Sequence, residues 1–460
     1  MDVLLNHIEG GETVRIVTHN DADGLAAGGI LCQMAIRLNA NFRTTCEKRV
    51  DEKMVKAIAE ENPPLVIFSD MGGTYLDILE KNFSENEVIV LDHHFPVECE
   101  APNIIHVNPL LHDLDGARGI SGAGVSYFFA KAVNDRNADL SPLGIIGALA
   151  DRQDKGEKKS LLGMNLSIEA DAKERGLLET NFDLIFYGYE TRPLARACAY
   201  TTSPFIPGLS GREDRCLNLL KEAGIELKNE GRWRSLRDLT EEEKRLLFSA
   251  LSKHMIYEGC EAEAVHELVG TIYTLTGEEP WTPMRDGREY ASLLNACARM
   301  GRPSLGLSIT IGDRGDALRE ASKTLLDYRG KIGEYLDWVR KGDRIRERLN
   351  TYSLVARADI DERIIGVVAS ILLTTGILKK EKPIIASAKA DGELIKISAR
   401  ANEKMAAKGL NLGEVMMRAS EPFEGRGGGH DIAAGAFLTE NSEEEFLELV
   451  DKYVGEQLES

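Results

Sequence analysis

Short apolar runs alternate with helically patterned segments through the first 150 residues of the chain. The runs are about five residues long and occupy residues 14–18, 42–46, 65–69 and 87–91. Between them, segments such as 25–38 and 54–59 place apolar residues at the three- and four-residue spacing of an amphipathic helix. Continuous apolar runs are typical of strands that are buried on both faces. The pattern therefore predicts an α/β domain with a parallel sheet covered by helices on both sides.

The remaining chain predicts three further segments after a first domain at residues 1–195. Residues 196–330 carry several helical patterns, and we expect a mostly helical accessory or insertion domain there. Residues 331–349 are expected to form one linker helix. Residues 350–460 are expected to form a smaller α/β domain, because strand signals return at 353–356, 383–387 and 395–400. A chain of 460 residues is long enough for two or three such cores.

Acidic and histidine side chains follow the predicted strands of the first domain. In parallel sheets, ligands bind outside the carboxyl ends of the strands, so we expect these side chains to converge. One further carboxylate closes the apolar helix expected at 143–150, which would pack beside the strand ends. The set comprises His19, Asp21, Asp23, Asp70, Asp92, His93, His94 and Asp151.

Carboxylates mixed with imidazoles indicate a site for hard divalent cations. Such ligands suit Mn²⁺ or Mg²⁺ better than a metal that prefers thiolates. The segment from His19 to Gly24 is not an EF-hand loop, because Ile30 stands where that loop needs a glutamate. One of the acids in this segment would also serve as a helix cap, but a cap does not use all of them. Because the set exceeds what one ion needs, we infer two ions that share a carboxylate, the arrangement that displaces groups at phosphorus.

A second candidate site lies near the C-terminus, in the glycine-rich segment 425–430. Three successive glycines, Gly427 to Gly429, allow backbone N–H groups to approach an anion closely, and Arg426 and His430 add donors. The segment is not a Walker loop, because no Gly-Lys-Ser/Thr follows. Taken alone, a glycine-rich turn is more often an ordinary loop.

Composition limits the classes of function. The net charge of −19 argues against a protein that coats nucleic acids and against one that binds an anionic membrane surface. Residues 329–348 nevertheless hold seven basic residues against four acidic ones, which indicates either a solvated helix or a track for a nucleic-acid backbone. Seven scattered cysteines without a CxxC motif indicate reduced thiols. With no long apolar stretch, we expect a cytoplasmic protein without a membrane partner.

The order of these motifs resembles that of the DHH phosphoesterase superfamily. The matching segments are His19 to Gly24, Ser69-Asp70, Asp92-His93-His94, Ile120 to Val125 and Ala148 to Asp151. Ser398 to Arg400 and Gly427 to His430 are similar to the DHHA1 domain, which in this superfamily binds substrate across a cleft from the DHH domain. Taken together, the chain looks like an archaeal RecJ-like exonuclease of the GINS-associated type.

This resemblance implies a role for each residue. One ion would be bound by His19, Asp21 and Asp70, and the other by Asp23, Asp70, His93 and Asp151, with Asp70 bridging the two. Asp92 would orient an imidazole, and His94 would contact the scissile phosphate. Bacterial RecJ proteins usually have an aspartate in place of His19. Residues expected to bind substrate are Ser398, Arg400, Gly428, Gly429 and His430.

The function implied by the resemblance is that of a single-strand-specific exonuclease with two Mn²⁺ ions, or Mg²⁺ in their place. We expect 5′-to-3′ hydrolysis of DNA in replication or repair, with the GINS complex and the replicative helicase as partners. Two alternatives stay open. One is an oligoribonuclease or small-nucleotide phosphoesterase, although such chains are typically shorter. The other is a helicase-associated scaffold, which the full set of ligand-type residues disfavours.

Overall fold

A five-stranded parallel sheet forms the centre of the N-terminal region in the computed structural model. Its strands, in the order β2-β1-β3-β4-β5, are β1 (Thr13–His19), β2 (Asn41–Glu47), β3 (Leu65–Ser69), β4 (Glu87–Leu91) and β5 (Ile104–Val107). The apolar runs at 65–69 and 87–91 form strands with these same bounds, since their β-branched and aromatic residues are buried on both faces. The predicted parallel sheet is confirmed.

The structure describes residues 1–459 except 99, 202–204, 261, 343, 375–377, 379, 380, 391 and 424. The described residues form two compact units. One comprises Met1–Tyr200 with Glu213–Leu325, and the other comprises Thr201–Arg212 with Leu326–Ser460.

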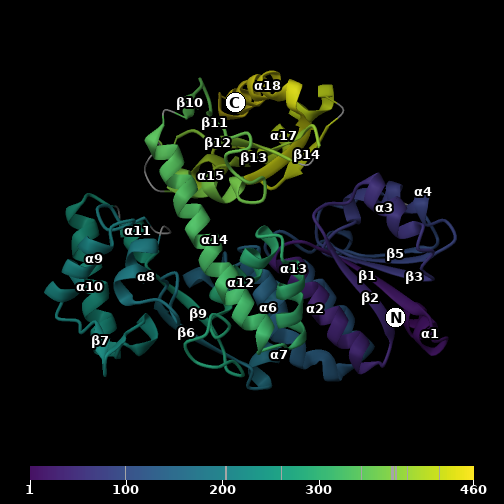
Figure 1. Ribbon diagram of the computed structural model, residues 1–460, viewed down its shortest axis with the longest axis horizontal. Coiled ribbons are helices and arrows are strands. Elements are labelled where there is room, and N and C mark those ends of the chain that lie inside the picture. The colour runs from purple at the N-terminus through teal and green to yellow at the C-terminus, as the bar shows by residue number, and fades with distance from the viewer. Residues whose placement is uncertain are drawn as a thin grey trace. The chain divides into compact units, whose positions relative to one another are not determined.

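Helices cover both faces of the parallel sheet (Figure 1). On one face, α3 (Glu52–Ala59) and α4 (Leu76–Asn82) pack on Val66, Phe68 and Val90. On the other, α2 (Ala22–Arg37) and α5 (Gly122–Val133) pack on the sheet, and α6 (Ser141–Ala150) packs on both of these helices. Helix α1 (Asp2–Glu9) precedes β1. In this order β2 is added on one side of β1, and β3 to β5 are added on the other. The carboxyl ends of β1 and β3, where the order of connection switches, border a natural ligand-binding crevice.

The chain is mostly helical between α6 and residue 325, and the predicted helical middle region is confirmed, although its helices begin before residue 196. Its helices are α7 (Asn165–Glu174), α8 (Leu194–Tyr200), α9 (Glu213–Glu222), α10 (Glu241–Tyr257), α11 (Ala262–His266), α12 (Gly287–Arg299) and α13 (Pro303–Ile311). A capping box starts α10, because Thr240 and Glu243 each bond to the other's backbone N–H. Although α12 and α13 fall within the expected accessory segment, α13 packs on α2, and α12 packs on α2 and α6.

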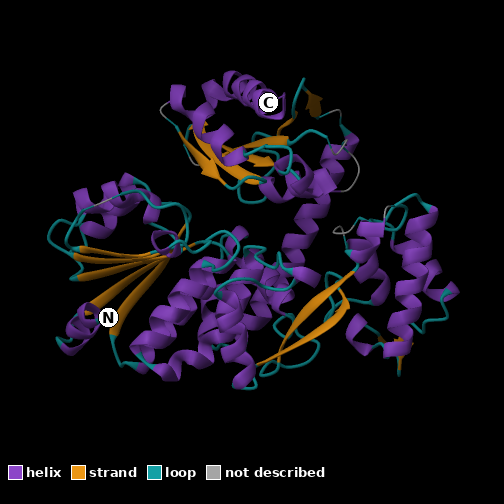
Figure 2. Cartoon of the chain, turned by 180° about the vertical axis from the view of Figure 1, so that it is seen from behind, coloured by secondary structure: helices purple, strands orange, loops and turns teal. Residues whose placement is uncertain are grey.

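An antiparallel ribbon lies within the helical segment, with one strand after α7 and the other before α12. Strands β6 (Leu178–Leu184) and β9 (Val269–Leu275) pair over their full length, and Leu184 lies opposite Val269 (Figure 2). The chain therefore leaves and re-enters the ribbon at adjacent residues. A small hairpin, β7 (Lys228–Asn229) with β8 (Arg232–Trp233), lies within the segment.

The second unit contains a six-stranded mixed sheet in the order β10-β11-β12-β13-β15-β14. Its strands are β10 (Ile345–Glu347), β11 (Tyr352–Val355), β12 (Ile384–Lys389), β13 (Leu394–Arg400), β14 (Arg426–Gly429) and β15 (Ala433–Thr439). Only β11 and β12 run parallel to each other. The helices of this region are α15 (Ile365–Thr374), α16 (Glu403–Ala406), α17 (Leu412–Ser420) and α18 (Glu443–Glu459). The predicted smaller α/β domain is confirmed.

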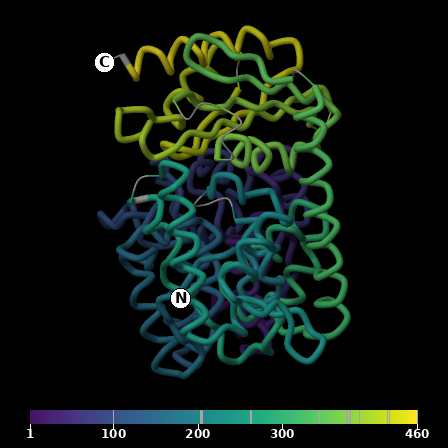
Figure 3. Tube along the Cα trace, turned by 90° about the vertical axis from the view of Figure 1, so that its left-hand side faces the viewer, coloured from purple at the N-terminus to yellow at the C-terminus, as the bar shows by residue number. Residues whose placement is uncertain are grey.

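Two local expectations differ from the structure. The helix expected over 331–349 is α14 (Asp316–Lys341), which appears as a long green coil in Figure 3. It ends before Gly342, a residue type favoured just after a helix, and residues 345–347 form strand β10. The glycine-rich segment is not a free loop, because residues 426–429 pair with β15 as strand β14.

Among the described residues, the structure contains no helix whose length and apolar character would let it span a bilayer.

Candidate functional site

The carboxyl ends of β1, β3 and β4 bring the predicted ligand residues of the first unit together. His19 ends β1, Asp70 follows β3, and Asp92 to His94 follow β4. Asp21 and Asp23 lie at the start of α2, and Asp151 is the residue that ends α6. All eight sequence-predicted residues of this group lie at the crevice between β1 and β3 or next to it.

Asp21 uses its two carboxylate oxygens for different purposes. Its Oδ1 accepts a hydrogen bond of 3.0 Å from the N–H of Gly24 and so caps α2. Its Oδ2 lies 3.0 Å from Nδ1 of His19. From the sequence, capping and metal binding are competing explanations for the acids of this segment, but the geometry allows one residue to do both.

Asp23 is held by the N-terminus of α5. Its Oδ2 accepts from the N–H of Gly122 at 2.7 Å, and its Oδ1 accepts from the N–H of Ala123 at 2.9 Å. The two donors belong to the first turn of the helix, where backbone N–H groups have no partner within the helix. These bonds fix the carboxylate with its Oδ2 3.7 Å from Nε2 of His93.

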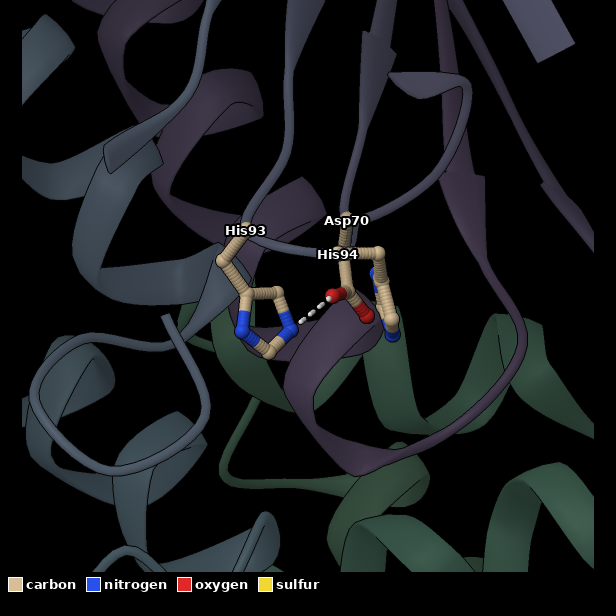
Figure 4. A group of neighbouring side chains, drawn as sticks. All are labelled: Asp70, His93 and His94. Atoms are coloured by element: carbon tan, nitrogen blue, oxygen red, sulfur yellow. Dashed lines mark ion pairs between the residues drawn. The ribbon is translucent and has the colours of Figure 1, made fainter. Parts of the chain in front are cut away.

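Asp70 presents one oxygen to each of two groups of side chains. Its Oδ1 lies 3.3 Å from Nε2 of His93, and its Oδ2 lies 3.5 Å from Nδ1 of His19. Figure 4 shows the Asp70 carboxylate between the rings of His93 and His94. The backbone of Asp70 adopts the left-handed conformation, with φ at +59°, and its N–H donates to the carbonyl of Leu91. This geometry suits a carboxylate that bridges two cations.

The His93 ring has one nitrogen fixed and one directed into a group of carboxylates. Its Nδ1 lies 2.7 Å from the carbonyl oxygen of Gly116, which only accepts, so Nδ1 carries the proton and donates it. The opposite nitrogen, Nε2, faces Asp70 and Asp151 at 3.3 Å each, and Asp23 at 3.7 Å. In the neutral ring Nε2 is an acceptor that faces acceptors, which requires either a proton or a cation at this position.

Buried atoms without a partner identify where a cation fits. Among the described residues, Nδ1 of His19, Oδ1 of Asp70 and Nε2 of His93 are buried and make no hydrogen bond. Buried polar atoms are normally satisfied, so three such atoms in one crevice need an explanation. A metal ion satisfies them, since each is a lone-pair donor of the type that Mn²⁺ and Mg²⁺ accept.

The ligand atoms fall into overlapping groups. His19, Asp21 and Asp70 form one group, Asp23, His93 and Asp151 form a second, and Asp70, His93 and His94 form a third, each with its ligand atoms within 4.8 Å of one another. Asp70 belongs to two of these groups and connects the residues around His19 with those around His93. The chain therefore holds acidic and histidine groups that can bind metal.

The pKa values of the buried acidic and histidine side chains indicate that the crevice favours a cation. Burial and the carboxylates of Asp70 and Asp151 raise the pKa of Asp23 well above its usual range. Burial also raises the pKa of Asp151 to about 6. Burial alone would lower the pKa of His93, but the carboxylates of Asp70, Asp151 and Asp23 raise it well above its usual value. These groups accumulate negative charge that a divalent ion would neutralise.

Asp92 orients the segment after β4 and does not face the ligand groups. Its Oδ2 accepts from the N–H of Gly73 at 2.8 Å, and its Oδ1 accepts from the N–H of His93 at 2.8 Å. The same Oδ1 lies 2.7 Å from Nδ1 of His94. Burial opposes ionisation of Asp92, but His94 and the backbone N–H groups keep its pKa below the usual range. The carboxylate thereby directs the other nitrogen of His94 away from itself.

Two glycines outside the predicted site residues give the carboxylates their space. A Cβ at Gly122 would lie 2.3 Å from Oδ1 of Asp70, and a Cβ at Gly147 would lie 2.1 Å from Oδ1 of Asp23. Gly147 also accepts the N–H of Asp151 one turn later in α6. Only glycine lets α6 approach Asp23 closely enough to present Asp151. Gly122 could be recognised from the sequence because it lies in the motif Ser121-Gly122-Ala123-Gly124. Gly147 could not, because no motif surrounds it in α6.

The predicted substrate residues of the C-terminal region lie together on the second unit's sheet. Ser398 on β13 and Gly428 on β14 both lie opposite Gly435 of the intervening β15. A Cβ at Gly428 would meet nothing within 4 Å, so this backbone borders open space. Gly429 has φ at +138° and leads to His430, whose N–H donates to the carbonyl of Ala433.

Arg400, at the end of β13, is oriented by neighbours that the sequence did not suggest. Its Nε donates to Oγ of Ser370 at 3.1 Å, and its Nη1 donates to the carbonyl of Ala399 at 2.7 Å. A Cβ at Gly366 would lie 2.7 Å from Nη2 of Arg400, so the guanidinium occupies space that a side chain would fill. A guanidinium fixed in this way suits a phosphate oxygen.

Three family domains match consecutive parts of the chain. Residues 13–150 match the DHH family, N-terminal domain, residues 186–269 match the DHH-CID domain, and residues 350–456 match the DHHA1 domain. An uncharacterized protein of Methanocaldococcus jannaschii is 32% identical over 99% of this chain and 95% of its own length. A putative prophage-derived single-strand DNA-specific exonuclease, YorK of Bacillus subtilis, is 25% identical over 36% of this chain and 30% of its own.

Solved structures share the fold at lower identity. RecJ from Thermus thermophilus, solved in complex with Mn²⁺, is 18% identical and superposes with a TM-score of 0.60. That comparison covers 99% of this chain and 54% of the Thermus chain, so the protein spans about half the length of that RecJ. CDC45 from Entamoeba histolytica is 11% identical, with a TM-score of 0.65 over 98% of each chain.

Proposed function

The chain belongs to the DHH family and has the domains of its RecJ-like members, and we propose that it is a metal-dependent exonuclease specific for single strands. The observation that carries the proposal is the position of Asp70. Its two oxygens face two different groups of ligand-type side chains, around His19 and around His93. A shared carboxylate of this kind is the mark of a two-ion site for hydrolysis at phosphorus.

The ligand residues fit two divalent ions. His19, Asp21 and Asp70 would bind one, and Asp23, Asp70, His93 and Asp151 would bind the other. Bound there, Mn²⁺ or Mg²⁺ would supply a water activated near neutral pH and positive charge for the phosphate oxygens. The Mn²⁺ in the RecJ structure supports manganese as the first ion to test.

His94 is the proposed contact to the scissile phosphate. Its Nδ1 is held by Asp92, and its side chain is more exposed than that of His93. Asp92 raises the pKa of His94, although burial opposes the shift. A protonated imidazole at this position donates to an anionic oxygen and attracts it. Asp92 acts through His94 and through the backbone, and it is proposed as a positioning residue.

The second unit is proposed to bind another phosphate of the strand. Arg400 supplies a guanidinium fixed by Ser370 and Ala399, and Gly428 supplies backbone that a ligand can approach closely, with Gly429 next to it. Ser398 and His430 complete the group. Because these contacts address the phosphate backbone, they would hold a strand of any sequence.

The proposed reaction is 5′-to-3′ hydrolysis of single-stranded DNA in replication or repair. The test is incubation with Mn²⁺ and end-labelled single-stranded DNA, duplex DNA, single-stranded RNA and a dinucleotide. Stepwise shortening of the single strands from the 5′ end is the expected result. Hydrolysis confined to the dinucleotide would indicate a small-nucleotide phosphoesterase, and binding without hydrolysis would indicate a scaffold.

A GINS subunit is the proposed protein partner of the helical segment. The support is the DHH-CID match at 186–269 and the fold shared with CDC45. The ribbon defines the two points of excision, because Leu184 and Val269 are paired at its end. The excised residues include Thr201–Arg212 of the second unit, and Glu190 and Thr191, which bond to Glu289 of α12. We expect a chain with a short turn in place of 186–267 to keep its activity on a dinucleotide and to lose capture by the GINS complex. Undiminished capture would place the partner elsewhere.

A further inference from the structure

Gln153 is fully buried, and both its side-chain nitrogen and its side-chain oxygen make hydrogen bonds. Its Nε2 donates to the carbonyl oxygens of Gly116, at 3.1 Å, and Ile120, at 3.0 Å. Its Oε1 accepts from Nδ2 of Asn165 at 2.7 Å, and Asn165 is fully buried as well. A buried amide that is satisfied on both sides, as that of Gln153 is, defines a single arrangement of the chain around it.

The Gly116 carbonyl is the link between Gln153 and the candidate metal site. The same oxygen accepts the proton on Nδ1 of His93 at 2.7 Å. That bond determines which nitrogen of His93 carries the proton, and it leaves Nε2 as the nitrogen that faces Asp23, Asp70 and Asp151. Partners of this kind fix the tautomer and the orientation of a histidine that binds metal.

The turn that carries this carbonyl is held from several sides. A Cβ at Gly116 would lie 2.3 Å from the carbonyl oxygen of His93, so the turn packs directly on the His93 backbone. Gln153 bonds to both ends of the turn, at Gly116 and Ile120. The N–H of Asn165 donates to Gly119 between them, and the N–H of Gln153 donates to Ala148 of α6. The side chain thus ties the turn to the helix that ends in Asp151.

We propose that Gln153 is the positioning residue that sets the His93 tautomer and thereby the binding of one of the two ions. The proposal rests on the proposed function, since it concerns the ion held by Asp23, His93 and Asp151. The other group is held differently, because His19 lies against Asp21 and Asp70, and Asp21 bonds to Gly24 at the start of α2. A defect at Gln153 therefore weakens one ion selectively and leaves the ion of the His19 group in place.

The variant Gln153→Met tests this, because methionine fills a similar volume without donors. We expect one of two Mn²⁺ affinities, measured by calorimetric titration of Mn²⁺ alone, to fall roughly 10- to 100-fold. Nitrogen-15 NMR of histidine-labelled, Mg²⁺-loaded protein should show a loss of the Nδ1–H signal of His93. The matched control is Gln33→Met, which removes a bond of 2.7 Å from an amide to the carbonyl of Thr310 in the same unit, away from the site.

The outcomes separate this inference from the proposed function. Wild-type protein that binds no Mn²⁺ would overturn the proposed function and this inference with it. If the wild type binds two Mn²⁺ ions and Gln153→Met shows the same affinities and the same His93 signal, this inference alone is overturned. Equal weakening of both sites in Gln153→Met would overturn it as well. If Gln153→Met does not fold, Asn165→Ala, which removes only the bond to Oε1, should weaken the same ion to a smaller extent. Unchanged affinity in that variant contradicts the assignment.

Discussion

Oδ1 of Asp70 and Nε2 of His93 face each other at 3.3 Å, and neither atom has a hydrogen-bond partner within the described part of the chain. The proton of His93 is on its other nitrogen, which donates to Gly116. Two lone-pair donors that point at one another in a buried crevice leave a position for a cation.

Loss of the Asp70 charge should abolish hydrolysis. Asp70→Asn keeps the shape of the side chain but removes the charge shared by the His19 and His93 groups. We expect kcat to fall by at least about 10²-fold and the number of bound Mn²⁺ ions to fall below two. Thermal unfolding in the absence of metal serves as the control for an intact fold. Activity close to that of the wild type would exclude the two-ion proposal.

A single methyl group at position 147 should disturb the carboxylates. In Gly147→Ala the new Cβ would meet Oδ1 of Asp23 and the Cβ of Ala123, so α6 or Asp23 must move. We expect weaker Mn²⁺ binding and a lower Tm. The matched control is Gly333→Ala in α14, where a Cβ meets nothing within 4 Å and alanine should stabilise the helix by about 0.5–1 kcal/mol. Equal effects of the two variants on Mn²⁺ binding would contradict the close packing of α6 on Asp23.

Arg400 should affect the substrate and not the metal. Arg400→Ala removes a guanidinium that Ser370 and Ala399 hold in place, and we expect KM for a single strand to rise about 10- to 100-fold. Arg400→Lys should recover only part of this loss, because an ammonium group lacks the planar fork. Calorimetry with Mn²⁺ alone should give wild-type affinities for both variants. A loss of Mn²⁺ instead would remove Arg400 from the substrate-binding group.

The stability of the fold should depend on pH through His7, and this dependence should not require a bound metal. It lies between Glu12 and Glu87, with Nε2 2.5 Å from the latter. Burial alone would lower the pKa of His7, but the two carboxylates raise it above its usual value. The folded protein therefore binds this proton more tightly than the unfolded chain does. The stabilisation is complete below the unfolded pKa of about 6.5 and is lost as the pH rises through the folded value.

The measurement is the Tm of wild type and His7→Gln at pH 5.5 and pH 8.5, without added metal. The difference between the two proteins should be larger at the lower pH. A difference that grows toward high pH would show that the charge of His7 does not stabilise the fold.

Strands that are almost entirely buried could be predicted from the sequence with their bounds. Residues 65–69 are buried throughout, and in 87–91 the exposed Glu87 is followed by four buried apolar residues. This local pattern leaves few alternatives. Because ligands bind at the carboxyl ends of parallel strands, the acidic and histidine residues that follow β1, β3 and β4 could be placed at one edge of the sheet. Asp151 could be added because the apolar helix before it had to pack on that sheet.

Features that depend on pairing between distant segments could not be predicted. Glycines 427–429 carry no side-chain pattern, and their strand exists because β15 offers a partner. The roles of Gly147 and Gln153 likewise depend on how closely α6 approaches Asp23 and on where the turn at Gly116 lies. No local property of these residues distinguishes them from an ordinary helix glycine or an exposed glutamine.

The left-handed backbone at Asp70 limits which residues can replace it during evolution. Outside glycine, this conformation is tolerated best by asparagine and aspartate, and branched or bulky residues are strained there. A lineage that abandoned catalysis would thus meet few obstacles in exchanging Asp70 for asparagine or glycine and many in exchanging it for valine or isoleucine. Relatives that have lost catalysis should therefore carry asparagine or glycine at position 70 and keep the same turn after β3.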